Sequence, residues 1–161
     1  GEKNAIPTDG IQIEIADKKI KRTWSILNSK DDKIHFSELL HPKDMVIAYA
    51  FTQIISPKNQ KVILSLGSND GIQVFLNGEK VHESHPLYGR WLQNDNDFIP
   101  VDLSKGSNNL MLKIDQGVGD FGYVVRFLDY DSIQTSIRQN IEKYKDLKVV
   151  AIADTLVTSF G

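Results

Sequence analysis

Residues 62–84 read VILSLGSNDGIQVFLNGEKVHES and predict three short strands joined by two tight turns. Over residues 62–66, apolar side chains recur at every second position, which is the period of a strand with one face against a core. The first turn, residues 68–71, reads SNDG, and each of these residue types favours a turn. The second turn is Asn77-Gly78, and both residues tolerate the left-handed dihedral angles of a type I′ turn. We therefore expect a β-hairpin centred on this Asn-Gly pair.

Further strand patterns extend on both sides of this stretch. They occupy residues 12–15, 24–27, 45–55, 98–103, 110–114 and 123–127. Short strands separated by turns, followed by one late helix, are typical of an all-β protein. The sequence therefore predicts an antiparallel jelly-roll β-sandwich with one C-terminal helix.

Two segments of this pattern carry specific expectations. Residues 45–55 form the longest strand pattern, and Ala48 and Ala50 on one of its faces would let another layer approach closely. We therefore expect a central strand that is covered on both sides. Residues 18–22 contain four cations, and a short run of charge indicates a solvated turn.

The chain changes character after residue 130. Ile133, Ile137 and Ile141 recur at helical intervals, and they predict a helix over residues 132–144 with Asp131 or Ser132 as its N-cap. Residues 148–157 then return to a strand-like pattern. We expect a β-sandwich domain over residues 1–130, and a helix and strand over residues 131–161 that form a linker into a further domain.

Composition excludes several classes of function. The chain of 161 residues has a hydrophobic content of 40% and a charged content of 25%, which are those of a soluble globular protein. A net charge of −2 argues against a surface that binds the phosphates of nucleic acid. There is no cysteine, and therefore no disulfide, no thiol nucleophile and no Cys-ligated metal. No apolar run has the length of a membrane span, and no signal peptide is present in this chain.

Motifs that mark common enzyme classes do not occur in the sequence. We find no nucleophile elbow, no phosphate-binding glycine loop, no zinc-protease motif and no dinucleotide-binding fingerprint. We therefore expect a protein that is not an enzyme, with a stand-alone hydrolase as the least favoured reading. No N-glycosylation sequon occurs either, which is compatible with a bacterial source.

Residues 46–128 resemble the galactose-binding-like jelly-roll family. The segments that carry the resemblance are AYAFTQIISP, LGSNDGIQVFLNGEKVHES, IPVDLSKGSNNLMLKI and GVGDFGYVVRF. The resemblance implies a non-catalytic accessory domain of a secreted carbohydrate-active enzyme, with a glycan and an adjacent domain of the same polypeptide as partners. It implies an extracytoplasmic location, secreted or periplasmic. Asn69 replaces the first acidic residue of the family turn, and Ser107 stands where an aromatic residue often occurs.

A second resemblance is to lectin-like domains of the anthrax protective antigen type. Sugar-binding members of that family ligate calcium through an acidic pair in the same turn, and Asn69-Asp70 is a weaker version of it. No cofactor is expected, and calcium is the one alternative. Residues 94–97, NDND, are a separate calcium candidate, because they offer four oxygen-bearing side chains in a row. The alternative for these four residues is a polar turn. His82 and His85 lack a third ligand that would make them a zinc site.

The candidate binding residues lie in two loops. Sugars bind to aromatic platforms that are assisted by a few polar groups. The irregular segment 83–96 offers such a mixture, and the glycine-rich segment 116–122 adds another aromatic ring. The predicted ligand-binding residues are Tyr88, Arg90, Trp91, His85, Asn94 and Phe121.

Each aromatic residue also has a structural alternative. The Trp91 ring could be buried between the loop and the sandwich, and Phe121 could belong to the core beside Tyr123. The sequence thus favours a carbohydrate-binding module. The alternative is a structural or protein-interaction domain that packs on a catalytic neighbour.

Overall fold

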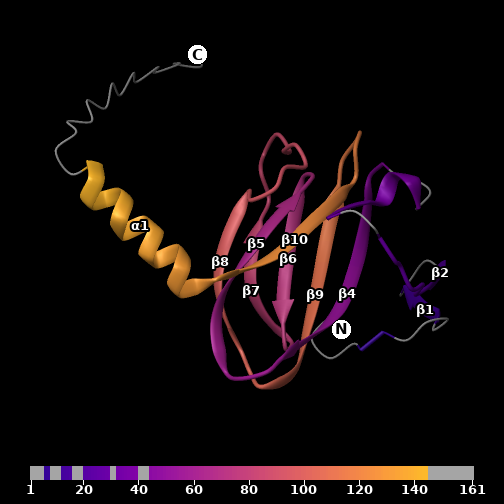
Figure 1. Ribbon diagram of the computed structural model, residues 1–161. Coiled ribbons are helices and arrows are strands. Elements are labelled where there is room, and N and C mark those ends of the chain that lie inside the picture. The colour runs from indigo at the N-terminus through magenta and orange to yellow at the C-terminus, as the bar shows by residue number, and fades with distance from the viewer. Residues whose placement is uncertain (1–5, 8–11, 16–19, 30–31, 40–43, 145–161) are drawn as a thin grey trace, which may run out of the picture. The chain divides into compact units, whose positions relative to one another are not determined.

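Two four-stranded antiparallel sheets pack face to face, as Figure 1 shows. The computed structural model describes residues 6–7, 12–15, 20–29, 32–39 and 44–144. One sheet has the strand order β3-β10-β5-β8, and the other has the order β4-β9-β6-β7. The predicted fold class, an all-β jelly-roll sandwich with one C-terminal helix, is confirmed. The strands of the first sheet are β3 (Lys33–His35), β10 (Gly122–Asp129), β5 (Gln60–Ser68) and β8 (Asp97–Leu103); those of the second are β4 (Val46–Ser56), β9 (Gly106–Gln116), β6 (Gly71–Leu76) and β7 (Glu79–Ser84).

The core lies between the two sheets and is built from alternate residues of the central strands. Several of its side chains are completely buried: Leu64, Leu66, Ile72, Val74, Ile114 and Phe121. The alternation that predicted β5 describes only one of its faces, because Ile63 and Ser65 on the opposite face are also buried, at 4% and 1% exposed. The 85–96 loop lies against part of that outer face: Asp95 accepts a hydrogen bond from Ser65, and the carbonyl oxygen of Gln93 lies over Gly67.

The two predicted turns have different roles. Asn77 and Gly78 have φ angles of 51° and 84°, and they connect β6 to β7 within one sheet. The predicted type I′ hairpin is therefore confirmed. The first turn also occurs, with Asp70 at a φ of 47°, but it carries the chain from β5 in one sheet to β6 in the other. It is a corner of the sandwich.

Gly78→Val should lower the free energy of unfolding by at least ~1 kcal/mol, because a β-branched residue resists a positive φ. Asn77→Gly is the matched control, since glycine is accepted at both positions of a type I′ turn. Thermal and urea unfolding of the three proteins measure the difference. Unfolding curves of Gly78→Val that coincide with those of the wild type would contradict the turn assignment.

Two predictions about strands are wrong. Among the strands that the structure describes, β4 lies at the end of its sheet and not at its centre. The side chains of Ile47 and Ile55 on its outer face are 56% and 72% exposed. β-branched and aromatic residues are typical of strands in general, so their pattern does not distinguish an edge strand from a central strand.

Residues 20–23 form β2 (Ile20–Thr23), which pairs with β1 (Gln12–Ile15), whereas residues 24–27 are not a strand.

The C-terminal region begins with helix α1 (Tyr130–Tyr144), directly after β10 ends. The helix starts two residues earlier than predicted, so Asp131 lies in its first turn, where a negative charge interacts favourably with the helix dipole. A 3₁₀ turn, η2 (Phe36–Glu38), follows β3. The chain divides into two compact units, residues 1–130 and 131–161. The predicted strand at 148–157 lies outside the described residues, and the role of residues 131–161 as a linker stays a prediction.

No helix in the described part of the chain is long and apolar enough to cross a membrane.

Candidate functional site

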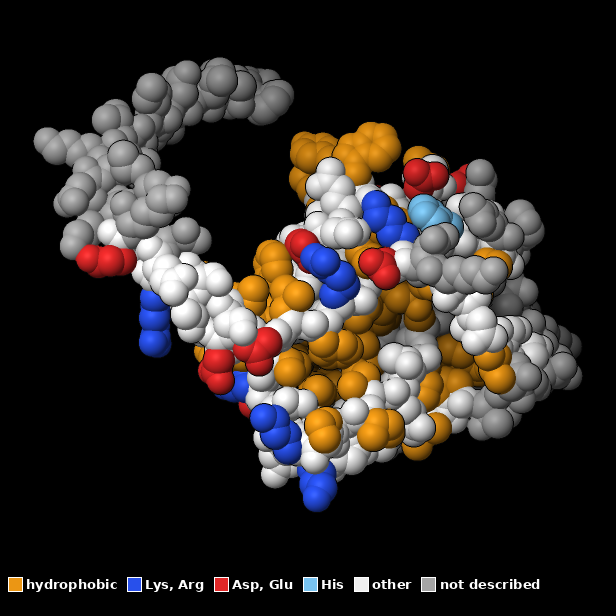
Figure 2. Space-filling model, viewed as in Figure 1, with side chains coloured by type: hydrophobic (Ala, Val, Ile, Leu, Met, Phe, Trp, Pro, Cys, Tyr) orange, Lys and Arg blue, Asp and Glu red, His pale blue; other side chains and the backbone are white. Residues whose placement is uncertain are grey.

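The loop of residues 85–96 carries the most exposed aromatic side chains of the sandwich. It connects β7 in one sheet to β8 in the other. Near its start, the N–H of Gly89 donates a hydrogen bond of 3.1 Å to the carbonyl oxygen of Pro86. This closes a turn with Leu87 and Tyr88 at its two corners, where they are 85% and 95% exposed. Figure 2 shows hydrophobic side chains projecting at the end of the sandwich where Figure 1 places this loop.

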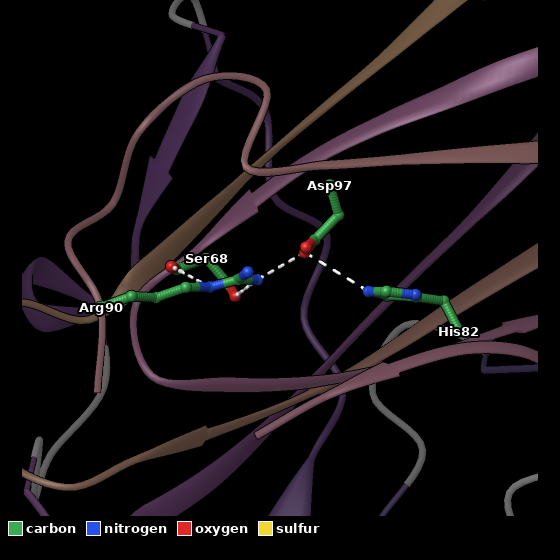
Figure 3. A network of polar contacts seen from close by, with 4 residues as sticks. All are labelled: Ser68, His82, Arg90 and Asp97. Carbon is green, nitrogen blue, oxygen red and sulfur yellow. Dashed lines mark hydrogen bonds and ion pairs between the residues drawn. The ribbon is translucent and has the colours of Figure 1, made fainter. Parts of the chain in front are cut away.

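Trp91 and Arg90 point in different directions from adjacent positions. The Trp91 side chain is 77% exposed. The Arg90 side chain is only 15% exposed, and its guanidinium donates to the carbonyl oxygen and the hydroxyl of Ser68 at 3.2 and 2.7 Å. It also donates to the Asp97 carboxylate at 2.7 Å (Figure 3). Arg90 therefore anchors the loop, and its guanidinium is largely withheld from solvent.

Asp97 links the loop to two strands. Its carboxylate lies between Arg90 and His82, whose Nε2 is 3.4 Å away, as Figure 3 shows. Burial of Asp97 opposes its ionisation, but the hydrogen bond and charge of Arg90, with a contribution from His82, outweigh this effect. The pKa of Asp97 therefore lies below its usual range. An ionised Asp97 is thus favoured in the folded protein, and it ties the base of the loop to β7 and β8.

A second anchor lies at the far end of the loop. Asp95, with a φ of 64°, accepts hydrogen bonds from the guanidinium of Arg126 on β10 and the hydroxyl of Ser65 on β5. These two bonds lower the pKa of Asp95. Next to this anchor the loop backbone rests on β5, since a methyl group placed on Gly67 would overlap the carbonyl oxygen of Gln93. The end of the loop is thus held against the outer face of the sheet.

Asp70 joins three loops at this end of the sandwich. Its Oδ2 accepts a hydrogen bond of 2.7 Å from the N–H of Gly117 in the β9–β10 connection. Its Oδ1 occupies the space that a side chain at position 89 would need. The N–H of Asp70 donates to the carbonyl oxygen of Arg90 at 3.4 Å. The exposed tip of the 85–96 loop is therefore carried on a fixed base.

The described residues do not gather three or more His, Asp or Glu side chains into a possible metal site. Within the predicted NDND segment, Asp95 and Asp97 each accept hydrogen bonds from an arginine. Asn94 and Asp95 form the polar turn that was the alternative to a calcium site.

The six predicted ligand-binding residues have different environments. Tyr88 and Trp91 are exposed as described, Asn94 is exposed, and the His85 side chain is 73% exposed with its Nδ1 3.1 Å from Asp115. Phe121 is 0% exposed, and its ring centroid lies 5.0 Å from that of Phe36. The expectation that Phe121 contacts a ligand is therefore corrected, because the residue belongs to the core. Leu87, which was not predicted, is exposed beside Tyr88.

The free energy of unfolding should be steady at neutral pH and fall as the pH drops below about 4, the ordinary pKa of an aspartate. Asp95 and Asp97 have lower pKa values in the folded protein than in the unfolded chain, so their contribution is present above that pH. It is lost when acid protonates them in the folded state. Urea unfolding between about pH 2 and pH 7 measures this loss. Asp97→Asn should show a shallower acid dependence, and an unchanged dependence would contradict the assignment.

No protein-family model matches the sequence, and no curated protein matches it. Among solved structures, the chain is similar to a β-glucosidase from Kluyveromyces marxianus, with a TM-score of 0.54 and 15% identity over 78% of this chain. A structure of the β-glucosidase from that organism in complex with glucose gives a TM-score of 0.49 and 15% identity over 71% of this chain. The similar region spans 17% and 15% of those chains. The chain therefore has a β-sandwich fold that also occurs within a β-glucosidase.

Proposed function

We propose that this protein is a non-catalytic carbohydrate-binding module, and that the tip of the 85–96 loop is its binding surface. The observation that supports this most strongly is the exposure of Tyr88 and Trp91, at 95% and 77%, on a loop with a fixed base. Large aromatic rings are rarely left in water without a partner. An aromatic ring supplies apolar contact to the flat face of a sugar, and a fixed loop loses little entropy when it binds.

Polar groups beside the rings would select among sugars. His85 and Asn94 are exposed on the same loop and offer groups that can donate to or accept from sugar hydroxyls. Arg90 anchors the loop next to Trp91 through its hydrogen bonds to Ser68 and Asp97, and in this proposal it does not contact the ligand. A small, open site of this kind should bind weakly, with a Kd of about 0.1–1 mM.

The host protein is part of the same proposal. A similar fold occurs within a longer β-glucosidase chain, and this supports a role as one domain of a larger carbohydrate-active protein. We infer an extracytoplasmic location and a bacterial source for such a protein. Residues 131–161 would then lead into the adjacent domain.

Trp91→Ala should abolish glycan binding while the melting temperature changes little, because an exposed ring contributes to the ligand and not to the core. A glycan array identifies the sugar, and calorimetry on the wild type and variant measures the loss. Phe98→Ala, which removes another exposed aromatic ring, on β8, is the matched control and should bind as the wild type does. Binding that survives Trp91→Ala would place the site elsewhere.

A protein-interaction role is the second candidate. Leu87 and Val118 are aliphatic side chains that are 85% and 75% exposed, and exposed apolar groups also mark contacts between domains. On this alternative no glycan binds, and Leu87→Ser weakens the association of the sandwich with the neighbouring domain of the full-length protein. If glycan binding depends on Trp91, a protein-interaction role is excluded as the main role of the loop.

A further inference from the structure

A solvent-accessible polar pair, His85 and Asp115, lies where the 85–96 loop begins. The Nδ1 of His85 lies 3.1 Å from a carboxylate oxygen of Asp115, near the end of β9. The two side chains are 73% and 37% exposed, so a ligand can reach both. By contrast, the side chains of Arg90 and Asp97, which anchor the loop, are only 15% and 16% exposed. The His85–Asp115 pair is therefore available to a ligand, whereas the anchoring pair is not.

Gly71 provides the space in which this pair forms. It lies opposite Asp115 where β6 pairs with β9. A Cβ atom at position 71 would overlap Oδ1 of Asp115 and lie 2.5 Å from Nδ1 of His85. The φ angle of Gly71 lies outside the left-handed region, so the backbone conformation does not require glycine there. The position instead requires a residue without a side chain, which lets the carboxylate and the imidazole meet.

The pair lies close to the exposed tip of the loop. His85 directly precedes the turn of residues 86–89. It is three positions before Tyr88, so the Cα atoms of the two residues are at most about 11 Å apart. Asp70, which is adjacent to Gly71, occupies the space that a side chain at position 89 would need. The tip and the polar pair therefore both rest on the corner between β5 and β6.

The chemistry of the pair suits it to hydroxyl groups. An ionised carboxylate only accepts hydrogen bonds, so a neutral His85 carries its hydrogen on the Nδ1 that faces Asp115. Its Nε2 is then an acceptor as well. Sugar hydroxyls can donate to both groups, and a hydrogen bond to a carboxylate is stronger than one between neutral groups. The pair can therefore hold a sugar by its hydroxyls.

The charge around the pair opposes an anionic ligand. The segments 69–71, 85–91 and 115–121 surround it, and their acidic side chains are Asp70, Asp115 and Asp120. The single arginine or lysine of these segments is Arg90, whose guanidinium donates to the Asp97 carboxylate. A negative ligand would thus meet carboxylates without an available cation, and like charges at close distance repel each other.

We propose that His85 and Asp115 form the polar half of the glycan site and restrict it to uncharged sugars. This inference rests on the proposed function, because the aromatic half of the site is the loop tip with Trp91. The apolar face of the sugar stacks on an exposed ring, and its hydroxyls donate to Asp115 and His85. A sugar that carries a carboxylate in place of a neutral group is rejected by the charge of Asp115.

Matched pairs of neutral and acidic sugars test this selection. The probes are the methyl glycosides of glucose, galactose and mannose and of the corresponding uronic acids, and the shift of the Trp91 indole N–H signal reports binding. The wild type should bind the uronic acids at least about tenfold more weakly than the neutral sugars. Asp115→Asn, which keeps the shape of the side chain and removes its charge, should weaken binding of the neutral sugar about tenfold and narrow its preference over the uronic acid.

Asp120→Asn is the matched control. It removes an exposed carboxylate from the β9–β10 connection, and it should change neither the affinity nor the preference. His85→Ala should weaken binding of the neutral sugar by about three- to tenfold. Thermal unfolding verifies that each variant is folded.

The outcomes separate this inference from the proposed function. If binding requires Trp91 but is the same in Asp115→Asn and His85→Ala, the polar pair is not part of the site and the proposed function stands. A wild type that binds uronic acids as tightly as neutral sugars would likewise overturn the inference alone. If no sugar of either kind moves the Trp91 signal, the proposed function fails and this inference fails with it.

Discussion

Replacing Asp97 with alanine should lower the free energy of unfolding by about 3 kcal/mol or more. The Asp97 side chain is only 16% exposed and accepts a hydrogen bond of 2.7 Å from Arg90, which is itself 15% exposed. Removing the carboxylate leaves a guanidinium with little access to water and without its anion. Breaking one half of a buried ion pair is among the most destabilising changes known for single residues.

Asp102→Ala is the matched control for this measurement. Asp102 lies on the same strand, β8, but its side chain is 79% exposed and its partner Lys61 is 3.9 Å away. An exposed pair of this kind contributes at most about 1 kcal/mol. Urea unfolding of both variants should therefore separate them by at least about 2 kcal/mol. Equal losses would show that Asp97 and Arg90 do not hold the loop.

Gly67→Ala should lower the free energy of unfolding by about 2–3 kcal/mol, because the added methyl group has no space. It would overlap the carbonyl oxygen of Gln93 and lie 2.7 Å from Cγ1 of Val124. The backbone of the 85–96 loop would have to leave the outer face of β5. The same change should weaken glycan binding, because the exposed tip depends on this base.

Gly106→Ala is the matched control for Gly67→Ala, because it restricts the backbone of a glycine without creating a steric clash. Gly106 has a φ of 97°, but an added methyl group there has no neighbour within 4 Å. Alanine should therefore cost only about 1 kcal/mol, through strain in the backbone, and leave glycan binding unchanged. A Gly67→Ala variant as stable as the wild type would mean that the loop does not rest on β5.

Local sequence signals predicted much of the sandwich. Features that depend on neighbouring residues can be predicted from sequence alone. They are the Asn77-Gly78 hairpin, the alternation in β9, and the inward direction of Tyr123 and Val125. The place of each strand in a sheet depends on distant partners. The pattern of β4 therefore predicted a strand correctly but placed it in the wrong position. In the same way, nothing within residues 62–66 shows that Asp95 of a later loop contacts Ser65 on their outer face.

The candidate loop was predicted only in part. Its irregular sequence and its aromatic residues identified Tyr88 and Trp91, and the Pro86–Gly89 turn explains why Leu87 is exposed with them. The inward direction of Arg90 depends on Ser68 and Asp97, neither of which is adjacent to it in sequence. The burial of Phe121 depends on its packing against Phe36. Contacts of this kind are absent from any single stretch of sequence.

The most direct test of carbohydrate binding is a titration of ¹⁵N-labelled protein with a glycan, followed through the indole N–H signals. The chain has two tryptophans, Trp24 and Trp91, so the spectrum should contain two such signals, and Trp91→Phe assigns them. We expect the Trp91 signal to shift progressively, with a Kd of about 0.1–1 mM, while the Trp24 signal stays in place. If the Trp91 signal does not move with any glycan that binds, or if no glycan binds at all, the proposed site is contradicted.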